Sequence, residues 1–159
     1  MRLSDDIHDL LFAMALRAKT RAVAPYSGFK VGAAVLSKEG NMYPGCNWEC
    51  SAYGLSRCAE QTALGNAIVA GESTIVAVAV VADVSKPCPP CGACRQLLFE
   101  YGPECIVLMS SLGGMIRSSS IRDLLPGAFS ADFLPERNRP AWERVSASFE
   151  PVRKDEHDE

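Results

Sequence analysis

Three cysteines and one glutamate, gathered in two short segments, constrain this chain more than any other feature. The first segment is Cys58-Ala59-Glu60, and the second, Pro90 to Gln96, contains Cys91 and Cys94. Both segments have the composition of a helix start, and a CxxC pair places two sulfurs about one helical turn apart. That spacing is typical of two zinc ligands. We therefore expect a fold that holds the two helix starts side by side.

The sequence leaves two other uses of these thiols open. Cys88-Pro89-Pro90-Cys91 resembles the CxxC of thiol oxidoreductases, but that motif should directly follow a strand and open a helix, and Cys94 would have no role. The spacing of Cys88, Cys91 and Cys94 also resembles an iron–sulfur motif. That motif expects a fourth cysteine three residues later, whereas the next one here is Cys105.

A three-ligand zinc site is most economically built from Cys58, Cys91 and Cys94. Three protein ligands leave one position for water, which is the arrangement of catalytic rather than structural zinc. Three thiolates make the centre formally anionic and a poor Lewis acid. Two helix N-termini aimed at the sulfurs would offset this charge, and Arg57 and Arg95 adjoin the ligands.

Composition limits the remaining possibilities. The 159 residues, 48% of them hydrophobic, suit one domain with a substantial core. The net charge of −3, without a Lys/Arg block, argues against a polynucleotide partner. Seven cysteines, an odd number, favour metal or redox chemistry over a disulfide framework. No secretory or membrane segment is recognisable, so we expect a cytoplasmic protein without a membrane partner.

Strands alternate with helices along the chain, which predicts an α/β sheet covered on both faces. Ser4 is expected to cap the first helix. A catalytic domain is predicted over residues 1–135, followed by a charge-rich, mobile tail over residues 136–159. Helices are expected at 4–22, 58–70, 92–101 and 121–125, and strands at 31–36, 42–47, 74–82, 105–109 and 115–117.

Taken in order, five motifs of the chain resemble the small homotetrameric zinc-dependent cytidine deaminases. The resemblance spans Pro25 to Phe129, and it implies a three-layer α/β/α cytidine-deaminase-like fold with a five-stranded mixed sheet. It also implies a homotetramer whose pockets borrow residues from neighbouring subunits. The motifs are Pro25-Tyr26-Ser27-x-Phe29-x-Val31-Gly32-Ala33-Ala34, Gly45-Cys46-Asn47-x-Glu49, Tyr53-Gly54-Leu55-x-x-Cys58-Ala59-Glu60, Pro90 to Gln96, and Leu124-Leu125-Pro126-x-x-Phe129.

The resemblance also implies roles for individual residues. One Zn2+ per subunit would be held by the three cysteines, with Glu60 as the catalytic proton shuttle. The substrate contacts would be Phe29 as an aromatic wall, Asn47 and Glu49 on the ribose 3′-hydroxyl, the Ala59 N–H on the base, and Tyr53 and Phe129 reaching a neighbour's pocket.

The implied reaction is hydrolytic deamination of cytidine, and of 2′-deoxycytidine, in pyrimidine salvage. Two alternatives stay open: a deaminase of a modified cytosine nucleoside of the antibiotic type, and a zinc module that binds or edits RNA. Three departures from the family pattern stand out. Gln61 occupies a position where all-Cys members usually carry Arg, Cys50 replaces a more usual Asn, and Cys88 is an extra thiol near the site.

Overall fold

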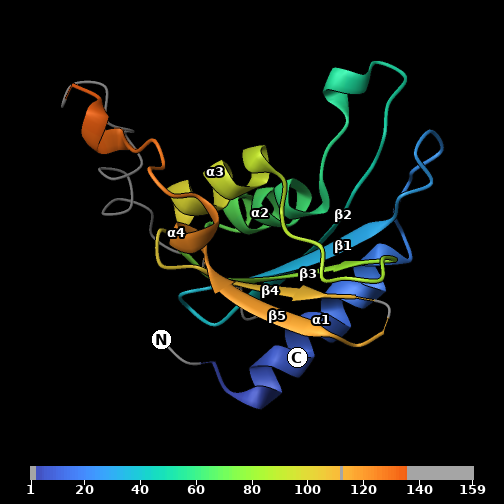
Figure 1. Ribbon diagram of the computed structural model, residues 1–159. Helices are drawn as coiled ribbons and strands as arrows, with labels where there is room; N and C mark the ends of the chain where they lie inside the picture. The colour runs from blue at the N-terminus through green and yellow to red at the C-terminus, as the bar shows by residue number, and fades with distance from the viewer. Residues whose placement is uncertain (1–2, 112, 136–159) are drawn as a thin grey trace, which may run out of the picture. The chain divides into compact units, whose positions relative to one another are not determined.

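The computed structural model describes residues 3–111 and 113–135 (Figure 1). Two compact units are distinguished, Met1–Ala128 and Phe129–Glu159. The first contains the sheet and the predicted zinc ligands. The second is described only over residues 129–135, and the predicted tail at 136–159 lies outside the described residues.

Each predicted helix and strand is found within a few residues of its expected bounds. The first unit contains α1 (Asp5–Lys19), β1 (Val31–Ser37), β2 (Met42–Cys46), the short 3₁₀ helix η1 (Tyr53–Leu55), α2 (Ala59–Val69), β3 (Ile75–Ala82), α3 (Gly92–Tyr101), β4 (Ile106–Ser110), β5 (Ile116–Ser120) and α4 (Ile121–Leu124). The second unit contains the 3₁₀ helix η2 (Ala131–Phe133).

The start of α1 differs from its prediction. Ser4 occupies the N-cap position, but its side chain makes no capping hydrogen bond, so the prediction of a side-chain cap is wrong. Asp5 and Asp6 lie in the first turn, where their charge complements the positive end of the helix dipole.

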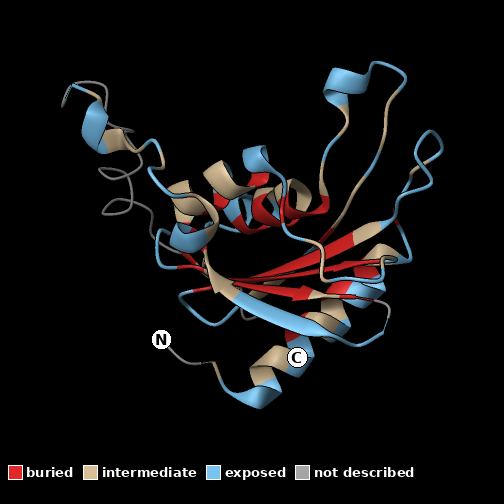
Figure 2. Cartoon of the chain, in the orientation of Figure 1, coloured by how far each residue is buried: buried red, intermediate tan, exposed pale blue. Residues whose placement is uncertain are grey.

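Five strands form one mixed sheet in the order β2-β1-β3-β4-β5, which confirms the expected sheet. Among the described strands, only the pair β3–β4 is parallel, and α3 provides the crossover between these two strands. The other three pairs are antiparallel. Because the central strands are covered on both faces, β1 and β3 are almost entirely buried (Figure 2).

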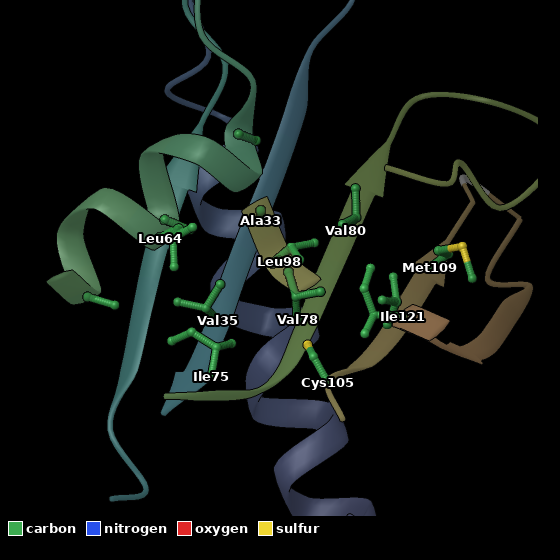
Figure 3. Packing of buried hydrophobic residues seen from close by; sticks show 14 residues of the cluster. Ala33, Val35, Leu64, Ile75, Val78, Val80, Leu98, Cys105, Met109 and Ile121 are labelled. Atoms are coloured by element: carbon green, nitrogen blue, oxygen red, sulfur yellow. The ribbon is translucent and has the colours of Figure 1, made fainter. Parts of the chain in front are cut away.

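Alternate residues of the central strands supply two separate cores. Ala33 and Val35 of β1 pack in the core beneath α2, α3 and α4, whereas Ala34 and Leu36 pack against α1. Figure 3 shows the first core, in which Leu98 and the β3 side chains belong to one buried cluster. The helices therefore form one layer on each side of the sheet, giving the predicted α/β/α arrangement (Figure 1).

The strand register gathers the predicted site at one end of the sheet. Val31 at the start of β1 pairs with Ala82 at the end of β3, and Gly32 pairs with Cys46 at the end of β2. The loops that precede β1 and follow β2 and β3 consequently meet at this end. These loops carry the residues expected to contact substrate and lead into the two cysteine segments.

A glycine allows α2 to lie unusually close to β2. A Cβ at Gly45 would lie 2.2 Å from the Ala63 backbone nitrogen and 2.4 Å from the Ala59 carbonyl oxygen. Any side chain at position 45 would therefore push α2, and the residues at its start, away from the sheet.

No helix in the described part of the chain is long and apolar enough to cross a bilayer.

Candidate active site

The structure brings Cys58, Cys91 and Cys94 together. Cys58 is the N-cap residue of α2, Cys91 is the N-cap residue of α3, and Cys94 lies in the first turn of α3. Their sulfur atoms all lie within 4.8 Å of one another, and the Cys58 and Cys91 sulfurs are 3.9 Å apart. Two helix N-termini therefore converge on three thiols, as the sequence predicted.

The spacing of these thiols fits a zinc ion. Two sulfurs on a tetrahedral zinc, each at about 2.3 Å, lie about 3.8 Å apart. The 3.9 Å separation of Cys58 and Cys91 is close to that value. Neither Cys88 nor any other described histidine, cysteine or carboxylate joins this cluster of three. The group thus has the donor number and chemistry of a catalytic zinc site.

The environment favours the thiolate form of Cys58. Hydrogen bonding from Cys94, and less strongly from Cys91 and the positive charge of Arg57, outweighs burial and lowers the Cys58 pKa to about 6. The same hydrogen bond to Cys58, together with burial, raises the pKa of Cys94. Cys58 is therefore the ligand best prepared to bind a cation.

Glu60 lies in the first turn of α2 and is only 6% exposed. Burial raises its pKa to about 7, and the negative charge of the Cys58 thiolate acts in the same direction. A carboxyl group with a pKa near neutral pH can both accept and donate a proton under physiological conditions. Glu60 consequently has the protonation behaviour that a proton shuttle needs.

A cavity of about 270 Å³ opens over these groups. It combines aromatic, polar and thiol side chains from all three loops at this end of the sheet. Its lining consists of Phe29, Val31, Asn47, Trp48, Glu49, Ser56, Arg57, Cys58, Ala59, Glu60, Val80, Cys88, Pro89 and Cys91. Four of the six residues expected to contact substrate therefore line this cavity: Phe29, Asn47, Glu49 and Ala59.

The two residues expected to serve a neighbouring subunit make aromatic contacts of their own. Tyr53 is 73% exposed and lines an adjoining hollow of about 310 Å³, which shares Glu49 and Ser56 with the cavity. Its ring meets that of Tyr26 edge-on at 5.6 Å. Phe129 belongs to the second unit, where its ring stacks on Phe133 at 5.8 Å. Tyr53 is not among the residues that line the cavity over the three thiols.

Asn47 and Glu49 hold the loop that leads to β1. The Asn47 side-chain oxygen accepts from the Val31 N–H, and its amide group donates to the Phe29 carbonyl oxygen, both at 2.8 Å. Glu49 accepts from the Tyr26 and Ser27 backbone N–H groups at 2.8 and 3.1 Å, and from the Ser27 hydroxyl. The Ser27 hydroxyl is the main cause that lowers the Glu49 pKa.

Gln61 and Arg95 support the two helix starts. The side-chain oxygen of Gln61 accepts a hydrogen bond from the Cys58 backbone N–H at 3.1 Å, so Gln61 caps α2. The Arg95 guanidinium donates to the carbonyl oxygens of Pro90, at 2.8 Å, and Leu124, at 2.9 Å. Arg95 thereby fixes the residue before Cys91.

Trp48, Ser56 and Val80 also line the cavity, although no motif of the sequence pointed to them. Trp48 lies between Asn47 and Glu49, and this position in the motif was the sequence signal that could have identified it as a cavity residue. Val80 lies in the middle of a buried strand, and only the sheet register places it beneath the cavity.

The comparisons with known proteins agree with this geometry. The cytidine and deoxycytidylate deaminase zinc-binding region matches residues 5–110. A cytidine deaminase of Halalkalibacterium halodurans is 47% identical, covering 77% of this chain and 94% of that protein. One from Sporosarcina psychrophila is 45% identical, with coverages of 78% and 92%.

A solved structure gives the same result. The crystal structure of cytidine deaminase from Burkholderia pseudomallei superposes with a TM-score of 0.74 at 46% identity, covering 77% of this chain and 98% of that one. All three thiols of the cluster fall within the matched zinc-binding region. The chain therefore belongs to the family of zinc-dependent cytidine and deoxycytidylate deaminases.

Proposed function

We propose that this chain converts cytidine and water to uridine and ammonia. The observation that carries the proposal is the grouping of three thiols within 4.8 Å beside the buried Glu60 carboxyl, at the wall of a cavity of about 270 Å³. Cys58, Cys91 and Cys94 would hold the zinc ion. When bound, zinc would lower the pKa of a water molecule so that hydroxide is available near neutral pH.

Glu60 would move the protons of the reaction. Its carboxylate accepts the proton that the attacking water loses, and delivers it to N3 of the cytosine ring while the C4–O bond forms. It then takes the proton of the new 4-hydroxyl group and delivers it to the 4-amino group, so that the C4–N bond breaks, ammonia leaves and the C4 carbonyl of uridine forms. The pKa of about 7 supports this role, since both protonation states of Glu60 are accessible at neutral pH.

The cytosine ring would lie between the start of α2 and Phe29. Ala59 is the first residue of α2, so its N–H belongs to the group of four that have no partner within the helix. This N–H would hydrogen-bond the base. Phe29 lines the cavity with its side chain 40% exposed, which supports a role as an aromatic wall rather than as a core residue.

Asn47 and Glu49 would bind the ribose 3′-hydroxyl. The Glu49 carboxylate has about four acceptor positions, of which three are used by Tyr26 and Ser27. The Asn47 amide retains one N–H beyond the bond to Phe29. A hydroxyl group can accept from Asn47 and donate to Glu49 at once, so one sugar hydroxyl would satisfy both.

The finer substrate range is part of the proposal. Neither residue assigned to the sugar requires a 2′-hydroxyl, so 2′-deoxycytidine would also be deaminated, and both reactions would serve pyrimidine salvage. A modified cytosine nucleoside is the second candidate substrate. Competition assays that pair cytidine with 2′-deoxycytidine and with an N-substituted cytosine nucleoside will rank the three.

We also propose a homotetramer with shared pockets, built on a catalytic domain over residues 1–135. The segment carrying Tyr53 projects beyond the sheet (Figure 1), and both Tyr53 and Leu55 are exposed on it. An exposed aromatic on a projecting segment suits a contact with a neighbouring subunit. Tyr53 and Phe129 would supply that contact. Light scattering of the wild type and of Tyr53→Ala will measure whether four chains associate.

The decisive experiment is a spectrophotometric cytidine assay with zinc content measured on the same samples. Wild type should release uridine and ammonia and contain one zinc per chain. Glu60→Gln should keep zinc and lose activity by about 10²-fold or more, because the proton shuttle is gone. Glu60→Ala serves as a second variant. Near-normal turnover in either variant would refute the role of Glu60 as proton shuttle. Active wild type without zinc would refute the role of the metal.

A further inference from the structure

We propose that Ser27 is a positioning residue that links the base-binding and sugar-binding parts of the pocket. The inference rests on the proposed function, because it assumes that Phe29 faces the cytosine and Glu49 the ribose. It assigns to one exposed hydroxyl the task of fixing these two groups relative to each other.

The Ser27 hydroxyl takes part in two hydrogen bonds at once. It donates to one carboxylate oxygen of Glu49, and it accepts from the Phe29 backbone N–H at 3.0 Å. The other Glu49 oxygen accepts from the backbone N–H groups of Tyr26 and Ser27. Glu49 is thus oriented by the loop, while Phe29 is oriented by a group that is itself bound to Glu49.

Phe29 depends on these polar contacts because it does not belong to either buried core. Its backbone N–H is bound by Ser27 and its carbonyl oxygen by the Asn47 amide. Between the two residues, Gly28 has a φ of +68°, and this conformation forms the turn that brings the Phe29 N–H back to the Ser27 hydroxyl. The aromatic wall is therefore held from both sides, by Ser27, which also orients Glu49, and by Asn47.

Removing the Ser27 hydroxyl would have a specific effect on Glu49. The carboxylate would keep two backbone donors on one oxygen but lose the donor on the other. The freed oxygen could rotate away from the position in which it receives the sugar hydroxyl. The Phe29 N–H would lose its partner in the same substitution, so the ring would also be less restricted.

The test uses two enzymes and two substrates. Ser27→Ala should reduce kcat/KM for cytidine about tenfold, mainly through KM, since a hydrogen bond to a charged group is lost and the reacting groups are untouched. With 3′-deoxycytidine, which lacks the hydroxyl that Glu49 would bind, the reduction should be several-fold smaller. Ser27→Thr keeps a hydroxyl at this exposed position and should restore wild-type KM.

Zinc content and Tm complete the measurement. Both should match wild type in Ser27→Ala, because Ser27 is exposed and outside the cysteine cluster. Ser118→Ala is the matched control, as Ser118 is exposed on β5 and lines neither cavity. Equal losses for both substrates, or unchanged kinetics in Ser27→Ala, would overturn the inference alone. A wild type that deaminates neither nucleoside would overturn the proposed function and this inference with it.

Discussion

Replacing Gly45 with alanine should damage both the stability of the fold and the candidate active site. Gly45 lies on β2 where α2 crosses it, and α2 begins with the residues that follow Cys58. The added Cβ would lie 2.2 Å from the Ala63 nitrogen and 2.4 Å from the Ala59 carbonyl oxygen. Both contacts are with backbone atoms, so no side-chain rotation can relieve them.

The size of the effect follows from these distances. To restore the 3.4 Å at which ordinary contact begins, the helix must move by about 1.2 Å near Ala63. Overpacking of a core costs about 1–3 kcal/mol, and a clash between two backbone segments belongs at or above the upper end. A shift of that size at the start of α2 also displaces Cys58 and Glu60, and displacements of about 1 Å can reduce turnover by about 10²-fold.

Urea unfolding and cytidine turnover measure the two consequences. Gly65→Ala is the matched control, because Gly65 lies on the same helix and an added Cβ there meets nothing within 4 Å. In a helix interior, alanine is more stabilising than glycine by about 0.5–1 kcal/mol. The same substitution should therefore destabilise at position 45 and stabilise at position 65.

Two results would refute this reasoning. If the urea midpoint of unfolding of Gly45→Ala equalled that of wild type, α2 and β2 would not pack as closely as the structure shows. If it lost stability but kept full turnover and zinc, the position of α2 would not control the site. The expected result is that Gly45→Ala loses both stability and activity. Gly65→Ala should lose neither.

The remaining predictions concern the two side chains that support the helix starts. Gln61→Arg places a cation beside three thiolates, so it should slow the loss of zinc to a chelator. The same substitution removes the cap on the Cys58 N–H, so it should lower the free energy of unfolding by about 1 kcal/mol. A rate of zinc release identical to wild type would show that the thiolate charge is offset elsewhere. Arg95→Gln removes charged hydrogen bonds to two carbonyl oxygens, so it should lower Tm, reduce the free energy of unfolding by about 2 kcal/mol and speed zinc loss. A wild-type Tm with wild-type zinc retention would exclude Arg95 as a support of Cys91.

Much of the fold could be predicted because its signals are local. The apolar runs that became β1 and β3 are buried on both faces, and uninterrupted apolar runs are what such strands require. β5 was predicted too short, at 115–117, since its serines have little intrinsic preference for a strand. Pairing with β4 extends it to Ser120, which shows tertiary contacts overriding composition.

The site was predictable in its chemistry but only partly in its contacts. From the sequence, Gln61 stood out only as a departure from the usual Arg, and the structure uses its side-chain oxygen to cap α2. Asn47 and Glu49 were expected to face a sugar, and the structure adds that they hold the loop of Phe29. Hydrogen bonds between residues about twenty positions apart depend on the sheet register, which no local pattern specifies.

The sequence by itself determined which groups are available: three thiols and a carboxylate at two helix starts, and strands able to be buried on both faces. Only the tertiary structure decided which thiols meet, placing Cys58 3.9 Å from Cys91 and leaving Cys88 outside the cluster although it lies three residues from Cys91. The physical reason is that residue type and helix capping are local properties. The meeting of distant thiols requires the pairing of β1 with β2 and β3, and the close packing of α2 that Gly45 permits.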